Sequence, residues 1–379
     1  MNQSQKNDAK QYLKYVSRLS MKTSQLSDSE IESVRRGYAK LDFEYIYEIG
    51  RVEKILPFIA FLFVRTKLDI HRWDLILSQY KERNLSILRF LEEAFTKFEK
   101  RGIKRIFVYE NYGALLQSGQ EIACFASGDI DLYADYSEQE SITSELQDCG
   151  FMPEDGDFSS LTVSTVYHNP TVLGSDGYRL NVMWQPLSRK KLPFPLDIDK
   201  CIDWEHLDSY KDTHIKLPSL DALLYLCLLH ISVHGYHRSP DMRLYTDTER
   251  LAVMNPDWDK IAAFAKHDKT EVRTATAAIL SKMLLDIPLP ESWISQYSRK
   301  FSQINKLIRR VYDKKYRYLS EEPFGLKVLL IEVLSSDKHW TRALVEMILP
   351  PKRWVRDYYL QGEGNILTAY LMHFKNLVR

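Results

Sequence analysis

Apolar residues recur with a helical period along several stretches of this chain. Between Asn84 and Gly102 they fall three or four positions apart, which predicts an amphipathic helix that ends at the glycine. Pro218 and Ser219 introduce a strongly apolar stretch that reaches Ile231, and we expect a buried helix there. Further helices are predicted at 258–266, 270–285, 302–313, 326–336, 340–348 and 365–377.

The first 78 residues also have a helical pattern, polar to amphipathic in character. Ser27 and Glu30 have the spacing of a capping box, which predicts a helix start. The longest apolar run, Ile55–Val64, is too short to cross a membrane and is typical of a buried helix. We therefore expect no membrane span, and the polar first residues predict no signal peptide.

Strand-like patterns separate the helices in the middle of the chain. A short helix is predicted over 110–116, and Ser137 with Glu140 predicts a capped helix that runs to about Cys149. The strands are predicted at 105–109, 129–134, 161–167 and 178–184. This order of helices and strands predicts one compact α/β unit of about 100 residues.

Two acidic residues stand two positions apart in the strand-like run at 129–134. Because residues i and i+2 of a strand point to one face, Asp129 and Asp131 project together. Two carboxylates on one face need a positive partner, and Mg²⁺ takes oxygen ligands while leaving positions open for phosphates. The pattern favours nucleotidyl transfer from a nucleoside triphosphate (NTP). A surface strand that carries two aspartates by chance has the same short pattern, so the context decides.

Composition narrows the partners and the compartment. The chain has 52 basic and 51 acidic residues and a net charge of +1, so general nucleic-acid binding is not expected. None of the four cysteines forms a CxxC pair, which predicts reduced thiols and a cytoplasmic protein. No GxSxG, P-loop or GxGxxG motif is present, so serine hydrolases, Walker-type ATPases and Rossmann enzymes have no support.

The order of several short motifs resembles a known family, the uncharacterised bacterial nucleotidyltransferases of the polymerase-β-like superfamily. The resemblance runs from about Arg83 to the C-terminus, and Gly128-Asp129-Ile130-Asp131-Leu132 matches its metal motif. Weaker matches follow the family's order: Arg83-Asn84-Leu85, Gly102-Ile103, Gly150-Phe151, Leu229-His230, His234-Gly235, Arg243-Leu244, Asp247, Asp257-Trp258-Asp259 and Leu289-Pro290.

This resemblance implies a fold and an activity. The fold would be α+β, with a small mixed-sheet nucleotidyltransferase core at 79–200 between an N-terminal helical region at 1–78 and a C-terminal helical domain at 201–379. The activity would be transfer of a nucleoside monophosphate (NMP) from an NTP to an acceptor hydroxyl, dependent on Mg²⁺ or Mn²⁺. The NTP would bind in the cleft between the core and the C-terminal domain.

Site residues follow from the same resemblance. Asp129 and Asp131 match the first two metal ligands, and Asn181 stands where a third acid normally helps to deprotonate the acceptor. Asparagine is no base near neutral pH, so Glu110 or Asp135 would have to compensate. The residues expected around the nucleotide are Asn111, Gly113, Ser127, Gly128, His230 and Arg243.

One turn departs from the family pattern, and the role of three histidines stays open. The usual Lys-Gly turn falls on Glu110-Asn111, and Gly113 is the substitute we expect for its glycine. His230, His234 and His237 share one helical face, which fits a metal site, a pocket wall or a purely structural cluster.

Three functions are compatible with these residues. The first is the metal-dependent transferase, with a small molecule, glycan or peptide as acceptor. The second is a degenerate member that binds a nucleotide or a partner protein without catalysis, which Asn181 favours. The third is modification of an RNA, against which the near-neutral charge argues. The sequence specifies neither the NTP, nor the acceptor, nor the oligomeric state.

Overall fold

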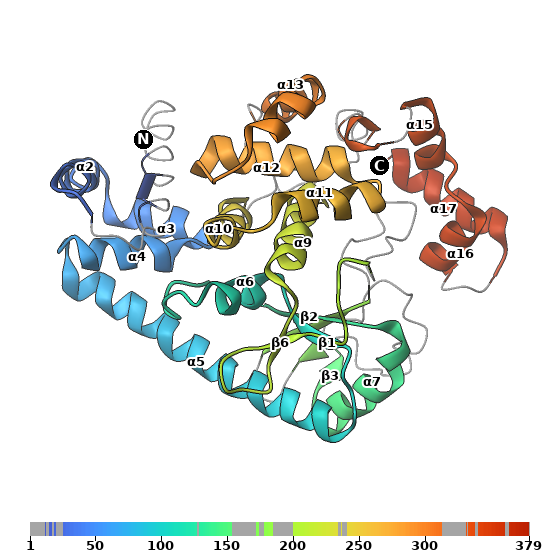
Figure 1. Cartoon of the computed structure of the whole chain (residues 1–379), viewed down its shortest axis with the longest axis horizontal. Coiled ribbons are helices and arrows are strands. Elements are labelled where there is room, and N and C mark those ends of the chain that lie inside the picture. The colour runs from blue at the N-terminus through green and yellow to red at the C-terminus, as the bar shows by residue number, and fades with distance from the viewer. Residues whose placement is uncertain are drawn as a thin grey trace.

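Figure 1 shows the computed structural model of the chain, in which a long helix runs from a cluster of N-terminal helices to a small sheet. A second, larger group of helices lies on the other side of the sheet. The structure describes residues 12, 15, 16, 19, 26–126, 129–153, 172, 173, 178–184, 200–233, 236, 241–312, 331, 333–337, 340–360 and 364–378.

The sheet has five strands in the order β1-β2-β5-β4-β3. Next to the edge strand, β2 (Asp129–Ala134) pairs antiparallel with β1 (Ile106–Tyr109) and parallel with β5 (Arg179–Met183). The remaining pairs are antiparallel, through β4 (Val172–Leu173) and β3 (Met152–Pro153). The sheet is therefore mixed, and the fold is α+β as expected. The strand predicted at 161–167 lies outside the described residues.

Two helices complete the α/β core. The long helix α5 (Ile70–Lys100) starts earlier than predicted and ends before Gly102, whose φ of +77° is the left-handed conformation that terminates helices. The short helix α6 (Glu110–Ser118) follows β1 with no intervening turn. A core of apolar side chains fills the space between α5 and the sheet, among them Leu91, Val108 and Leu132.

One predicted helix start is wrong. The helix α7 (Gln139–Asp148) has no side-chain cap, although Ser137 and Glu140 have capping-box spacing. Instead the chain makes a single 3₁₀ turn, η1 (Tyr136–Glu138), and Asp135 caps that turn by accepting a hydrogen bond from the backbone N–H of Ser137. The cap after β2 therefore belongs to the 3₁₀ turn and not to α7.

The N-terminal helices agree with their sequence signals. Ser27 and Glu30 form a reciprocal capping box at α2 (Asp28–Tyr38). The helix α3 (Phe43–Val52) follows, and the apolar run becomes the buried helix α4 (Leu56–Arg65). Among the described residues no helix is long and apolar enough to span a membrane.

The C-terminal helices include two that the apolar pattern missed. These are α10 (Asp241–Ala252) and α16 (Lys352–Leu360). The predicted helices at the other described positions are confirmed, although α13 begins eleven residues earlier than expected. They are α9 (Leu220–Val233), α11 (Trp258–His267), α12 (Glu271–Leu285), α13 (Glu291–Tyr312), α15 (Trp340–Ile348) and α17 (Ile366–Val378). Most of the helix predicted at 326–336 lies outside the described residues.

The two outer helical groups share one apolar core. Ile59 of α4 and Phe63 belong to the same buried cluster as Leu224 of α9 and Ala278 of α12. The helix α5 also continues without a break through residue 78. The division of the chain at residues 78 and 200 remains a prediction.

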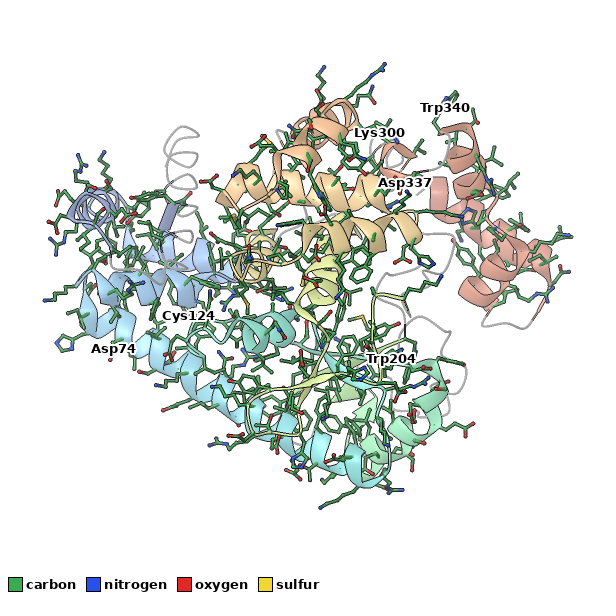
Figure 2. The ribbon with its side chains drawn as sticks, in the orientation of Figure 1. Asp74, Cys124, Trp204, Lys300, Asp337 and Trp340 are labelled. Carbon is green, nitrogen blue, oxygen red and sulfur yellow. The ribbon has the colours of Figure 1, made fainter. Side chains whose placement is uncertain are left out.

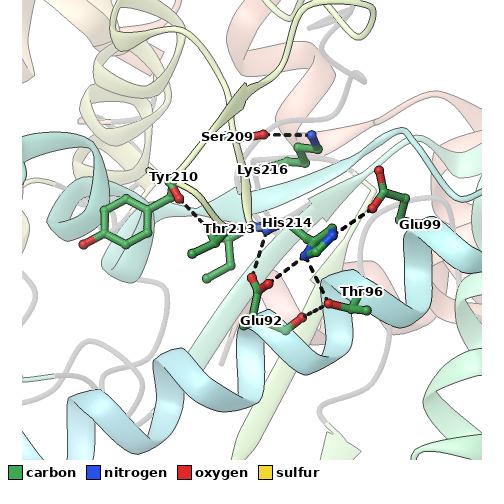
Figure 3. A network of polar contacts seen from close by, with 9 residues as sticks. Glu92, Thr96, Glu99, Ser209, Tyr210, Thr213, His214 and Lys216 are labelled. Carbon is green, nitrogen blue, oxygen red and sulfur yellow. Dashed lines mark hydrogen bonds and ion pairs between the residues drawn. The ribbon is translucent and has the colours of Figure 1, made fainter.

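A polar network ties a two-stranded hairpin to α5. Between β6 (Asp208–Ser209) and β7 (Lys216–Leu217), the ring of His214 lies between two carboxylates of the helix (Figure 3). Its Nδ1 is 2.6 Å from Oε1 of Glu92, and its Nε2 is 3.3 Å from Oε2 of Glu99. These contacts hold the hairpin against the C-terminal part of α5, and β7 lies beside β1.

Candidate active site

The paired carboxylates lie on β2, the strand that the sequence predicts at 129–134 and that pairs with β1 on one side and β5 on the other. Asp131 is buried, with 6% of its surface exposed, and Asp129 is partly exposed. In the strand register, Tyr109 of β1 and Asn181 of β5 stand opposite Asp131 on either side. These three side chains therefore share one face of the sheet.

Two amides hold the Asp131 carboxylate. Nδ2 of Asn181 donates to Oδ1 of Asp131 over 3.1 Å, and Nδ2 of Asn111 donates to Oδ2. The parallel pairing of β5 supplies the first amide, and the first turn of α6 supplies the second. The structure thus brings together three of the predicted site residues and uses both carboxylate oxygens of Asp131.

Glu110 adds a third carboxylate to this group. It is the first residue of α6, is 5% exposed and has a φ of +47°, a left-handed conformation that costs energy in a residue other than glycine. Nδ1 of His230, on α9, lies 2.5 Å from its Oε1. Asp135 is not part of this group, because it pairs with Arg105 at the other end of β2.

Burial and neighbouring charges raise the pKa of Asp131 to about 7. Desolvation is the largest cause, and the charge of Glu110 acts in the same direction. The hydrogen bond from Asn181 and the charge of Arg243 oppose this rise. Burial is therefore the main reason that this carboxyl group holds its proton more tightly than a free aspartate does.

The helix α10 brings further buried charges up to α6 and α9. Arg243 Nη1 lies 3.7 Å from Oδ2 of Asp247, and Arg250 Nε lies 3.8 Å from Oδ1 of the same aspartate. Burial raises the pKa of Asp247 to about 6, against the effect of both arginines. Asp247 is one of the weaker matches to the family pattern, whereas Arg250 belongs to no motif that the sequence reveals.

Gly113 has a packing role in this structure. A Cβ atom on it would lie 2.7 Å from the carbonyl oxygen of Val108, so only glycine allows α6 to fold back so closely on β1. The residue sits inside the helix and not in a turn. Its contact with a triphosphate stays a prediction, as does any role of Ser127, Gly128, His234 and His237, which lie outside the described residues.

A comparison with protein families identifies the chain. Residues 40–286 match a family described as Uncharacterised nucleotidyltransferase, and the match extends from before α3 to the end of α12. The chain belongs to this family. It is therefore a transferase, and the general reaction of its class moves an NMP group from an NTP. No curated protein and no solved structure matches the chain.

The carboxylate group of this nucleotidyltransferase fits a divalent cation by charge and by donor type. Among the described residues, no three side chains of His, Cys, Asp or Glu come together as a metal-binding group. Oδ1 of Asn111, however, is a buried oxygen that no hydrogen-bond donor of the described chain reaches. A hydrated cation beside Asp131 would satisfy this oxygen and stabilise the charged form of the buried carboxylate.

Proposed function

We propose that the enzyme transfers an NMP from an NTP to an acceptor hydroxyl, with Mg²⁺ or Mn²⁺ held by Asp129 and Asp131. The buried Asp131 carboxylate carries this proposal, because it shares one strand face with Asp129 and carboxylate oxygens are the ligands that Mg²⁺ prefers. The bound metal would neutralise the phosphates and draw electron density from the reacting phosphorus. A small molecule, a glycan or a peptide would supply the hydroxyl, and we place the enzyme in the cytoplasm.

The chain's own residues divide the remaining work. Asn111 and Asn181 orient Asp131, and Arg243 supplies donors to the phosphates, because its Nε and Nη1 have no acceptor among the described residues. The hydroxyl oxygen forms a bond to the α-phosphorus while the bond to the bridging oxygen breaks and pyrophosphate leaves. Glu110, held by His230, takes the hydroxyl proton in place of the missing third acid.

Calorimetric titration of ATP, GTP, CTP and UTP, each with and without Mg²⁺, tests the proposal. We expect one or more NTPs to bind only when Mg²⁺ is present. The titration also identifies the preferred base. Equal binding with and without Mg²⁺, or no binding of any NTP, would contradict the proposal.

A specific observation favours a second function, nucleotide or partner binding without catalysis. Asn181 occupies the place of an acid, and it donates a hydrogen bond to Asp131 where an acid would repel it. A chain that had lost its chemistry would keep a hydrogen bond of this kind at the position of the acid.

The variant Asn181→Asp separates these two functions. It removes one hydrogen bond to Asp131 and adds a carboxylate, so we expect the metal-free protein to melt at a lower temperature. In Mg²⁺ we expect it to bind NTP more tightly and to hydrolyse or transfer about tenfold faster or more. The new carboxylate adds a second base, and a general base contributes about 10²–10⁴-fold. Asn181→Ala is the control that loses the hydrogen bond without gaining a charge. Equal activity in both variants would favour the binding function.

A further inference from the structure

The loop between α6 and β2 precedes the strand that carries Asp129 and Asp131. It leaves the helix at Gly119 and leads into Asp129, and its residues from Ala123 to Ala126 are buried. Buried carbonyl groups need hydrogen-bond donors. In this loop, side chains from two helices that lie far apart in the sequence donate hydrogen bonds to the carbonyl groups.

Asn84, in the middle of α5, is the first of these side chains. It is 1% exposed, and its Nδ2 donates to the carbonyl oxygens of Ile122 at 2.7 Å and Phe125 at 3.1 Å. Its Oδ1 accepts a hydrogen bond of 3.0 Å from the hydroxyl of Tyr112 on α6. Both donors and the acceptor of this amide are thus used, which fixes its orientation.

Arg250, on α10, is the second. Its fully buried guanidinium donates to the carbonyl oxygen of Cys124 and, over 2.9 Å, to Oε1 of Gln120. The same group lies 4.4 Å from the centre of the Phe58 ring on α4. Cys124 lies on the side of the loop that faces the N-terminal helices (Figure 2).

We propose that Asn84 and Arg250 are positioning residues for the transferase, which clamp the loop 119–126 and so place Asp129 and Asp131 relative to Arg243. The hydrogen bonds that both side chains donate go to the loop, so both act through it. The N-terminal helices contribute to this clamp through Phe58 of α4. Its ring packs against the guanidinium that donates to the carbonyl oxygen of Cys124. The link to catalysis rests on the proposed function, whereas the clamp itself does not.

Hydrogen exchange and NTP binding together test the clamp. The variants are Asn84→Ala, Arg250→Met, Arg250→Lys and the mild Tyr112→Phe, which removes only the hydroxyl that orients Asn84. We expect amides of the loop 119–126 to exchange about tenfold faster or more in the first two variants. Affinity for the Mg²⁺ complexes of ATP, GTP, CTP and UTP should fall by about the same factor, with smaller losses for Arg250→Lys and Tyr112→Phe.

Tyr225→Phe is the matched control, because it also removes a buried hydroxyl. That hydroxyl bonds Oδ2 of Asp268 at 2.6 Å and Oγ1 of Thr270 at 2.8 Å, away from the loop. We expect a lower melting temperature in this control, with unchanged loop exchange and unchanged NTP affinity. A purely structural role of the clamp would instead weaken NTP binding in every variant in proportion to its loss of stability.

The two readouts keep the clamp distinguishable from the proposed function. Loop exchange that stays at the wild-type rate in Asn84→Ala and Arg250→Met, or in Tyr112→Phe if those fail to fold, overturns the clamp whatever NTP does. Faster loop exchange with unchanged NTP affinity overturns the positioning role. Failure of the wild-type protein to bind any NTP refutes the proposed function and, with it, the positioning role, and leaves the clamp to be judged by exchange alone.

Discussion

Replacing Asp131 by asparagine is expected to abolish Mg²⁺-dependent NTP binding and to make the metal-free protein more stable. The variant removes a charge that the metal needs, and a metal supplies several kcal/mol of transition-state stabilisation, so transfer should fall by about 10³-fold or more. The amide fits the site, because Asn111 can turn its unsatisfied Oδ1 toward the new N–H₂ group. Binding measured by calorimetry and transfer measured by pyrophosphate release check the first part.

The gain in stability follows from the pKa of Asp131. The folded protein holds this proton up to about pH 7, whereas the unfolded chain releases it near 3.8. The stability of the folded state therefore falls as the pH rises between these values, by an amount on the order of 4 kcal/mol for this group. We expect the wild-type melting temperature to decline from pH 5 to pH 7.5 in the absence of metal, and Asp131→Asn to decline less.

Two comparisons make this prediction sharp. Asp247 keeps its own pKa of about 6 in the variant, so a smaller decline should remain up to that pH. Adding Mg²⁺ at pH 8 should raise the melting temperature of the wild-type protein and leave that of Asp131→Asn unchanged. If Asp131→Asn melts at a lower temperature than the wild type at pH 8, the charged form of Asp131 does not destabilise the folded protein, and the prediction is wrong.

The strand that carries the site could be predicted because its signals are local. A period of two places Asp129 and Asp131 on one face whatever the rest of the chain does, and β2 appears as expected. Glu110, by contrast, enters the site through an unusual backbone conformation at the start of α6. Glutamate does not indicate such a conformation in a sequence, because glycine, asparagine, aspartate and histidine are the residue types that favour it.

The helix α10 was missed for a physical reason. Apolar periodicity detects helices that bury apolar residues, but α10 buries charged ones, including Arg243, Asp247 and Arg250. These charges are tolerated because α6, α9 and the loop before β2 bring partners to them. Arg250 and its partner Cys124 lie more than a hundred residues apart in the sequence, so only the fold brings them together.

A similar limit applies to the capping prediction at Ser137. Ser137 and Glu140 have the spacing of a capping box. In the structure, however, Asp135 is the cap, and its side chain accepts a hydrogen bond from the backbone N–H of Ser137. Local signals therefore identified the helix but not its start.

Removing the charge of Arg243 should have the second large effect. Arg243→Met removes a buried cation whose charge acts on both Asp131 and Asp247, and breaking a buried pair costs about 3–5 kcal/mol. We therefore expect a large fall in melting temperature. We also expect NTP affinity to fall about tenfold to hundredfold, because charged hydrogen bonds contribute about 1.5–3 kcal/mol each.

A double variant separates these two effects. Asp247→Asn neutralises the partner that Arg243 leaves behind, so Arg243→Met/Asp247→Asn should regain most of the lost stability. Its NTP affinity should stay low, because the guanidinium that we assign to the phosphates is still missing. Asp247→Asn alone is the matched control and should bind NTP as the wild type does. Recovery of NTP binding in the double variant would show that Arg243 only balances the buried acids, and the phosphates would then need another cation.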